Sequence, residues 1–349
     1  MDTASSDRVT INARSWHWCK ASRLAIVPEL AGARHEFPFE GRQTVVKLPS
    51  RVPEIGGKYD PHAPLTCDSW RQVDGVNIPL RYGVHEFAMY IDITDSIIVP
   101  AQALKLPNTQ YELFSEREQK QLGVITKEQE KIADRALSYW LKVLRWKSRI
   151  GFIGEPEIRM FDDSGVPRLQ DITSGHTFWC GPFIAFAEAR QAITQEVWQD
   201  TSKALASGAV APIWFDFLFD SQHRLNNSDF TAAILSMAIA LEVMVRKLVT
   251  HHLDGLPIES ILHEVIDTAN FRSILNRIGK LSFWSEELKR ACDLSAFNEL
   301  MSVRDKVMHS ADTSRVDPER LQAIYNRLET FAYAVSGHLL KEPSDRTLG

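Results

Sequence analysis

The hydrophobic pattern of the chain changes its period partway along. Before about residue 100, short apolar or alternating runs, such as 44–48 and 86–93, are separated by prolines and glycines, which predicts strands and turns. From about residue 184 onward, apolar residues recur at helical spacing almost without a break. Strands bury every second side chain and helices every third or fourth, so the two halves must build different cores. We therefore predict an α+β protein, with a β-rich domain over residues 1–183 and an all-helical bundle over residues 184–349.

One helix is expected within or beside the first domain. Ile132, Leu137 and Leu141 fall on one side of a helix over residues 126–146. Thr126-Lys127-Glu128-Gln129 has the pattern of a capping box, which predicts that the helix begins there. An amphipathic helix of this kind should turn its apolar side toward the rest of the domain.

Three short sequences in the first domain contain residues with chemical potential. Trp16-His17-Trp18-Cys19 includes two types of metal ligand, but no second cluster completes a site, and a packed strand explains it better. Gly56-Gly57-Lys58 lacks the rest of a phosphate-binding loop and is better explained as a turn. Asp162-Asp163 lies in the turn of a hairpin predicted over 157–169, where solvated acids are commoner than a cation site. We expect no metal and no cofactor.

The composition limits the compartment and the partners. A net charge of -5 over 349 residues argues against a strongly basic protein that coats nucleic acid, so any RNA contact must come from a local patch. The four cysteines show no paired spacing, which predicts free thiols in a reducing cytoplasm. The apolar run at 230–241 is shorter than the ~20 residues that span a bilayer, so we expect a buried helix and no membrane contact.

The helical half divides at turn and capping signals. Gly208 should end one helix, Ser228 or Asp229 should cap another, and Asp317-Pro318 should open the last. These signals predict helices over 187–207, 212–225, 229–251, from 257, 270–281, 285–308 and from 317.

The helix predicted over residues 285–308 ends in a polar sequence. Leu300 and Val307 recur at core-facing spacing, whereas Arg304 and Asp305 lie on other faces and His309 falls near the helix end. Asp305 and His309 are four residues apart, so on a regular helix the carboxylate can hold one ring nitrogen and leave the other free. Arg304 lies roughly 140° around the helix from His309, so both can face one pocket only if the last turn unwinds or the site is an open groove.

Arg304-Asp305-Lys306-Val307-Met308-His309 resembles the R-polar-x-x-x-H signature of HEPN domains, which are helical modules of prokaryotic toxin, anti-phage and RNA-processing proteins. Segments 217–220 and 227–242 resemble the paired first helices of these domains, with acidic Glu242 midway along the second. The resemblance covers roughly the last 150 residues. It departs from the usual pattern at Asp305, where Asn is common, and at Ser310, where Gly is common.

The resemblance implies a metal-independent endoribonuclease, in which the ribose 2'-hydroxyl attacks the neighbouring phosphate. His309 would transfer protons, Arg304 would contact the phosphate, and Asp305 would assist. It also implies a homodimer with one shared site, RNA as substrate, and an antitoxin or phage-derived trigger as a further partner. Glu242 either reaches Arg304 and positions it or simply pairs with Arg246 one turn away.

The same residues also fit a protein that is not an enzyme. Arg304 and Asp305 could form only a surface ion pair, and His309 could serve as a cation at a helix end, worth ~0.3 to 1 kcal/mol. The helical half would then dimerise or bind a nucleotide or protein without cleaving RNA. Two further groups, His251-His252 and the pair Asp216 and Asp220, are better explained by helix capping and an exposed acidic face than by metal binding.

Overall fold

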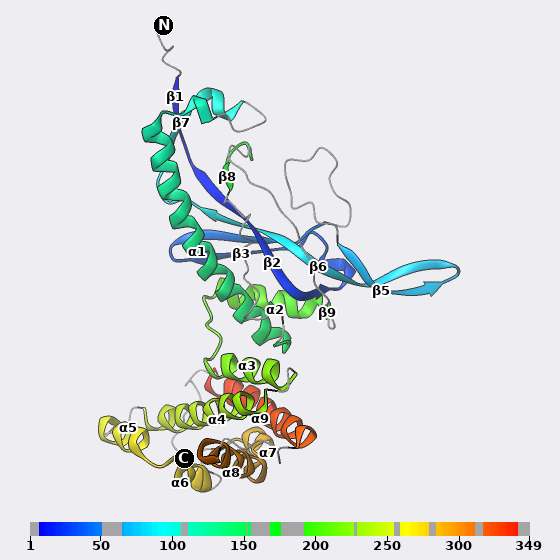
Figure 1. The fold of residues 1–349 in the computed structure, drawn as a ribbon, viewed down its shortest axis with the longest axis vertical. Helices are drawn as coiled ribbons and strands as arrows, with labels where there is room; N and C mark the ends of the chain where they lie inside the picture. The colour runs from blue at the N-terminus through cyan, green and yellow to red at the C-terminus, as the bar shows by residue number, and fades with distance from the viewer. Residues whose placement is uncertain are drawn as a thin grey trace. The chain divides into compact units, whose positions relative to one another are not determined.

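The protein is described by a computed structural model, which defines residues 7–50, 65–105, 111–151, 153–154, 168–175, 192–226, 229–254, 259–278, 284–310 and 317–340. The chain forms two compact units, Met1–Val210 and Ala211–Gly349. The first is built around a β-sheet and the second is helical (Figure 1), which confirms the predicted α+β class. The predicted turn at Gly56-Gly57-Lys58 and the predicted turn at Asp162-Asp163 lie outside the described residues.

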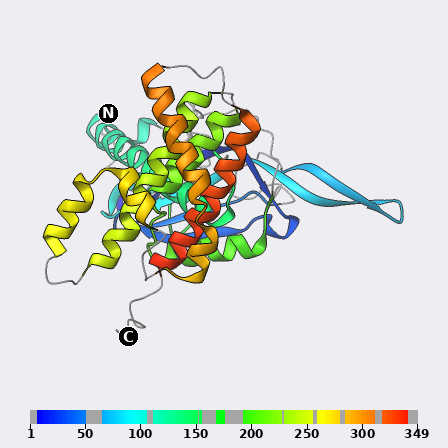
Figure 2. The ribbon, with the colours of Figure 1, turned by 90° about the horizontal axis from the view of Figure 1, so that it is seen from below.

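The sheet of the first unit is organised around two long antiparallel strands, β2 and β6. They pair from Arg14 opposite Asp92 to Ile26 opposite Tyr82, with an irregularity between Lys20 and Leu24. The strand order is β3-β4-β6-β2-β8, with β5 added on β6 and β9 parallel to β2, whereas β1 and β7 form a separate two-stranded sheet. The hairpin of β5 and β6 projects beyond the other strands in both views (Figures 1 and 2). The strand bounds are β1 Arg8–Ile11, β2 Ala13–Ile26, β3 Arg34–Phe39, β4 Arg42–Lys47, β5 Thr66–Val73, β6 Val76–Asp92, β7 Ile97–Pro100, β8 Arg168–Asp171 and β9 Ala192–Ile193.

Helix α1, Glu116–Ser148, lies along one face of this sheet (Figure 1). Its buried side, which includes Ile132, Leu137 and Trp140, joins the strands in one apolar core. The helix begins ten residues before the predicted start, so the prediction that Thr126 caps it is wrong. Thr126 lies inside the helix, where its hydroxyl donates to the Leu122 carbonyl at 2.5 Å.

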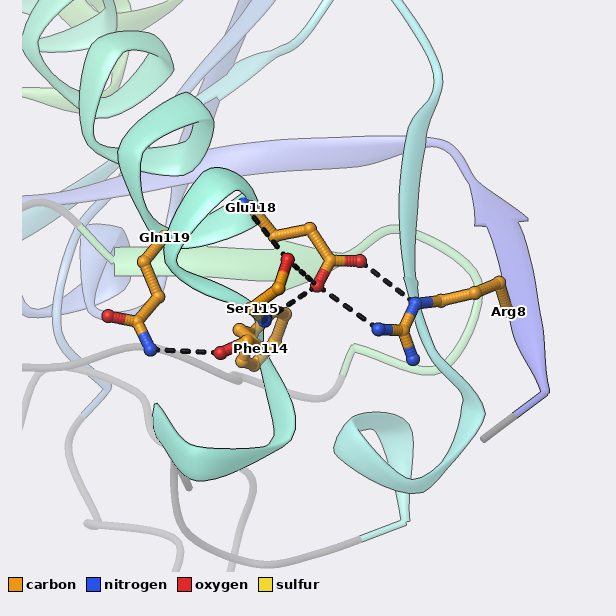
Figure 3. A network of polar contacts seen from close by, with 5 residues as sticks. All are labelled: Arg8, Phe114, Ser115, Glu118 and Gln119. Atoms are coloured by element: carbon orange, nitrogen blue, oxygen red, sulfur yellow. Dashed lines mark hydrogen bonds and ion pairs between the residues drawn. The ribbon is translucent and has the colours of Figure 1, made fainter. Parts of the chain in front are cut away.

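The capping box that starts α1 is made by Ser115 and Glu118 (Figure 3). The Glu118 amide donates to Ser115 Oγ at 3.4 Å, and Glu118 Oε2 accepts from the Ser115 amide at 2.8 Å. Arg8 of β1 grips the same carboxylate through Nε and Nη2, at 2.8 and 3.1 Å. Burial opposes ionisation of Glu118, but the hydrogen bonds from Ser115 and Arg8 outweigh it and lower its pKa. The helix start is therefore tied to the β1 strand.

Helix α2, Gln195–Ala206, belongs to the first unit, although the sequence pattern grouped it with the helical half. Its Trp198 stacks on His35 of β3, with ring centroids 3.6 Å apart, and its carbonyl bonds His35 Nε2 at 2.9 Å. The Tyr139 hydroxyl of α1 donates to the carbonyl of Ala209 just after α2, at 3.0 Å. The predicted boundary at 183 lies outside the described residues, and the compact units divide after Val210.

The second unit is a bundle in which α4 contacts α3, α5, α8 and α9. α4 is the most apolar of these helices, and Asp229, one of the two caps that the sequence predicted, accepts from the Ala232 amide at 3.2 Å. Two predicted helices are corrected: 285–308 is broken at Cys292-Asp293 into α7 and α8, and the helix predicted over 187–207 begins only at Gln195, after strand β9. The bounds are α3 Trp214–Asn226, α4 Phe230–Leu253, α5 Glu259–Thr268, α6 Phe271–Ile278, α7 Glu286–Ala291, α8 Leu294–Ser310 and α9 Pro318–Leu339. In the part of the chain that the structure describes, no helix has the length and apolarity that crossing a membrane requires.

Candidate functional site

The helix that carries the HEPN-like signature, α8, is amphipathic as predicted. Phe297, Leu300 and Val307 are buried in the bundle. At its C-terminal end Met308 is 58% exposed and His309 is exposed. The last turn of α8 therefore presents the end of the signature to solvent.

Asp305 lies between two arginines. Its Oδ1 pairs with Arg304 Nη1 at 3.1 Å, and its Oδ2 pairs with Arg272 Nη2 of α6 at 2.9 Å. The side chains of Arg272, Arg304 and Asp305 are 44%, 39% and 37% exposed. Ion pairs this exposed contribute only ~0 to 1 kcal/mol, so another anion can compete with Asp305 for these guanidinium groups at little cost.

Among the described residues, no hydrogen bond or ion pair joins Asp305 to His309. The expectation that this carboxylate holds one ring nitrogen of His309 is therefore not met, because both of its oxygens are engaged by arginines. His309 lies in the last turn of α8 and is exposed.

Arg272 is the residue of this site that sequence reasoning missed. It also donates to Ser302 Oγ at 3.4 Å, and Ser302, Asp305 and His309 follow each other at spacings of three and four along α8. Arg272 thus contacts the side of α8 on which Ser302, Asp305 and His309 lie. Arg304 lies further around the helix from that side than His309 does. No local signal marks Arg272, because it precedes the signature by about thirty residues and lies on another helix.

Glu242 does not contact Arg304 among the described residues. Its Oε1 pairs with Arg246 Nη2 at 2.7 Å, which is the simpler of the two expectations for this residue. Arg246 also donates to the carbonyls of Ile266, Asp267 and Ala269, the last two at 3.3 and 3.1 Å. Glu242 therefore orients an arginine that binds the free carbonyls at the end of α5, and its role here is to join α4 to α5.

The alternative chemical groups named from the sequence are engaged in packing. His17 and Cys19 are buried in β2, and burial lowers the pKa of His17 to about 3 and raises that of Cys19 well above its usual value. Asp220 bonds Arg224 at 2.8 Å and accepts from Ser236 Oγ at 2.6 Å, so it links α3 to α4. These contacts leave neither group presented to a ligand.

The adjacent histidines at the end of α4 contact different partners. His252 Nε2 lies 3.0 Å from His338 Nε2 of α9, and His251 Nδ1 lies 3.9 Å from Asp254 Oδ2. Asp254 Oδ1 is also 3.2 Å from His263 Nε2 of α5. Within the described ranges, no three histidine, cysteine or acidic side chains converge in a geometry that could hold a metal ion.

The arrangement on α6 and α8 can bind an anion and transfer a proton. Two guanidinium groups share one carboxylate, which leaves other donors of each group without a partner among the described residues, and an exposed imidazole lies one turn further along α8. In the described part of the chain these side chains are partly or fully exposed, which suits an extended polyanion better than a small enclosed substrate. Comparison of the chain with protein-family models, with curated proteins and with solved structures found no match.

Proposed function

We propose that the helical unit is a HEPN-type endoribonuclease that cleaves RNA without a metal ion, in a prokaryotic defence or stress response. The observation that carries the proposal is the half-exposed cluster of Arg272, Asp305 and Arg304 beside exposed His309. Phosphate oxygens would displace Asp305 from the arginines, because planar guanidinium groups bind phosphate through paired hydrogen bonds. An open surface lets a long RNA lie across the site.

His309 transfers the proton in this mechanism. The ribose 2'-hydroxyl attacks the adjacent phosphorus, its proton leaves to a base, and the bond to the 5'-oxygen breaks as that oxygen is protonated, which gives a 2',3'-cyclic phosphate. Imidazole suits proton transfer near neutral pH, which typically contributes roughly 10² to 10⁴-fold. Arg272 and Arg304 stabilise the charge that grows on the phosphate oxygens.

At this site the described residues of one chain supply one imidazole, whereas the reaction needs a base at the 2'-oxygen and an acid at the 5'-oxygen. A second copy with its own His309 meets this need, so the proposal includes a homodimer with a composite site. Mixed dimers of wild-type and His309→Ala chains should then lose more than half of the activity per site. Light scattering measured on the same samples checks that the dimer is intact.

The direct test is cleavage of a labelled RNA in the presence of a chelator. We expect wild-type protein to give 2',3'-cyclic phosphate ends, and His309→Ala to be at least about 100-fold slower. Arg272→Ala should lower kcat/KM about tenfold or more, because it removes a charge-assisted contact. Arg277→Ala removes an exposed arginine from the same helix, α6, and should change little.

Two outcomes would overturn the proposal. One is the absence of cleavage by wild-type protein on both structured and unstructured RNA. The other is activity that His309→Ala retains or that the chelator abolishes. A substrate with a single 2'-deoxyribose at the cleaved position should resist cleavage, and its cleavage would exclude attack by the 2'-hydroxyl.

One observation favours a non-catalytic alternative, in which the helical unit binds RNA or another polyanion but does not cut it. Both oxygens of Asp305 face arginines, so this carboxylate does not orient His309. Asp305→Asn distinguishes the two functions, because it frees the arginines without removing the imidazole. RNA binding that strengthens in Asp305→Asn, with no cleavage in any variant, would support the binding module.

A further inference from the structure

A cavity of about 1020 Å³ lies in the first unit, far along the chain from the proposed nuclease site. One wall is the first half of α1, from Ser115 at its cap to Gln129, a length of ~21 Å at 1.5 Å per residue. The other wall is the connection 93–96 and the start of β7. The volume is at the upper end of the ~300 to 1,000 Å³ typical of small-molecule sites.

Part of the cavity lining is aliphatic. Ile93, Ile97, Leu122 and Ile125 line it, and they belong to the small apolar cluster that joins β7 to α1. No aromatic side chain lines the cavity among the described residues, so the walls offer no ring on which a nucleobase would stack. An extended aliphatic chain fits this lining better than a nucleotide does.

One end of the cavity holds two hydrogen-bond donors that have no partner among the described residues, and one of them, Arg42 Nε, is fully buried. Gln129 is 2% exposed, and its carboxamide oxygen accepts from Ser15 Oγ at 3.2 Å, whereas its amide nitrogen bonds no described residue. Arg42 uses Nη2 on Glu128 at 3.3 Å, but its buried Nε has no partner in the described structure. Because a buried donor without an acceptor is costly, Arg42 Nε points to a ligand that supplies an oxygen acceptor, and Gln129 Nε2 offers a second donor in the lining of the same cavity.

The remaining charges favour an anionic ligand. Of the acids lining the cavity, Glu118 is gripped by Arg8 and Glu128 by Arg42, as Figure 3 shows for Glu118. Arg117 and Lys120 form no ion pair with the described residues and stand at the other end of the α1 wall. Asp95 is the one lining acid that no described cation pairs, so unpaired cations exceed unpaired acids.

We propose that this cavity binds a linear aliphatic carboxylate. Its carboxylate accepts hydrogen bonds from Gln129 Nε2 and Arg42 Nε, and its chain lies between Leu122 and Ile125 of α1 and Ile93 and Ile97 opposite. Arg117 and Lys120 attract the anion toward the cavity. The site is separate from the proposed nuclease residues, and its existence does not depend on their activity.

The test is titration calorimetry of the full chain with decanoate, below its micelle-forming concentration. We expect saturable binding of one decanoate per chain, and much weaker binding of decanol and of decyltrimethylammonium, which keep the chain length but not the negative charge. Gln129→Leu removes the carboxamide donor and should weaken decanoate at least about tenfold without changing decanol. Lys131→Gln removes an exposed cation from α1 outside the cavity and should leave decanoate affinity unchanged.

Equal binding of the three ten-carbon probes would overturn the proposal, since it would show a generic apolar surface. No saturable binding of decanoate, or binding that Gln129→Leu leaves unchanged, would overturn it as well. If Gln129→Leu fails to fold, Ile125→Asp provides the second test, because a charge in the aliphatic wall should abolish decanoate binding. Circular dichroism of each variant establishes that it is folded before the titration.

Discussion

The protein is expected to lose stability between about pH 7.5 and about pH 5, and replacing His35 with glutamine should make this loss about 2 kcal/mol smaller. His35 lies in the core between two tryptophans of different helices. Its Nδ1 accepts from the indole Nε1 of Trp140 at 2.9 Å, and its Nε2 lies 2.9 Å from the carbonyl of Trp198. An imidazole that accepts at one nitrogen and donates at the other must be neutral, so this geometry fixes both its charge and its tautomer.

The magnitude follows from the pKa of this imidazole. Burial lowers the pKa of His35 from 6.5 to about 4, against a smaller opposite effect of the hydrogen bond to Trp198. The unfolded chain therefore takes up a proton at higher pH than the folded chain does. The stability that neutral His35 contributes is fully present above about pH 6.5 and is lost as the pH falls toward about 4. The loss is about 3 kcal/mol in all and about 2 kcal/mol at pH 5.

Urea unfolding of wild-type and His35→Gln protein at both pH values, followed by tryptophan fluorescence, measures this difference. Glutamine keeps one acceptor and one donor but does not titrate, so its stability should fall less on acidification. Buried His17, whose pKa burial lowers to about 3, accounts for pH dependence that remains. The control is His309→Gln, because that histidine is exposed in the other unit. Imidazole ¹⁵N shifts that show His35 titrating above pH 6, or equal acid sensitivity in both proteins, would refute the reasoning.

Two further predictions concern the helical unit. Asp229→Ala should lower its unfolding free energy by about 1 kcal/mol, because the carboxylate caps α4 and also pairs with Arg224 at 3.1 Å; a denaturant titration with no change would show that water replaces the cap. Arg246→Met should increase amide hydrogen exchange in α5 by about tenfold or more, since it frees the terminal carbonyls of that helix; exchange that rises equally in α9 would instead indicate general destabilisation.

The elements that the sequence predicted well are those with local determinants. The cap of α4 at Asp229 and the start of α9 after Asp317 each rest on a side chain that bonds an amide two or three residues away. The predicted start of α1 was wrong because two segments, Ser115 to Glu118 and Thr126 to Gln129, have the spacing of a capping box, and the prediction used the second. The apolar cluster that includes Leu122 favours the first start, because a helix that begins at Ser115 carries Leu122 into this cluster.

A local signal for the break between α7 and α8 exists at Asp293, but the apolar period of the sequence outweighed it in the prediction. Asp293 accepts from the Ala296 amide at 3.0 Å, and the carbonyl of Asp293 bonds the Phe297 amide at 3.0 Å, which together start a new helix. The apolar period continues across the break, so periodicity alone joined the two helices. Whether a potential capping residue inside a periodic run starts a new helix depends on the directions in which the helices pack, and packing is a tertiary property.

The signature from Arg304 to His309 shows the same limit at the level of chemistry. Its residue types and spacing are local, but the partner of Asp305 is chosen by the position of α6, which brings Arg272 within 2.9 Å. Asp305 was expected to orient His309, but because of this contact it pairs with Arg272 and Arg304 instead. A motif can therefore supply candidate residues for a site, while a helix that is distant in the sequence decides which contacts each of them makes. The arginine on α6 belongs to the proposed site as much as the two residues that define the signature.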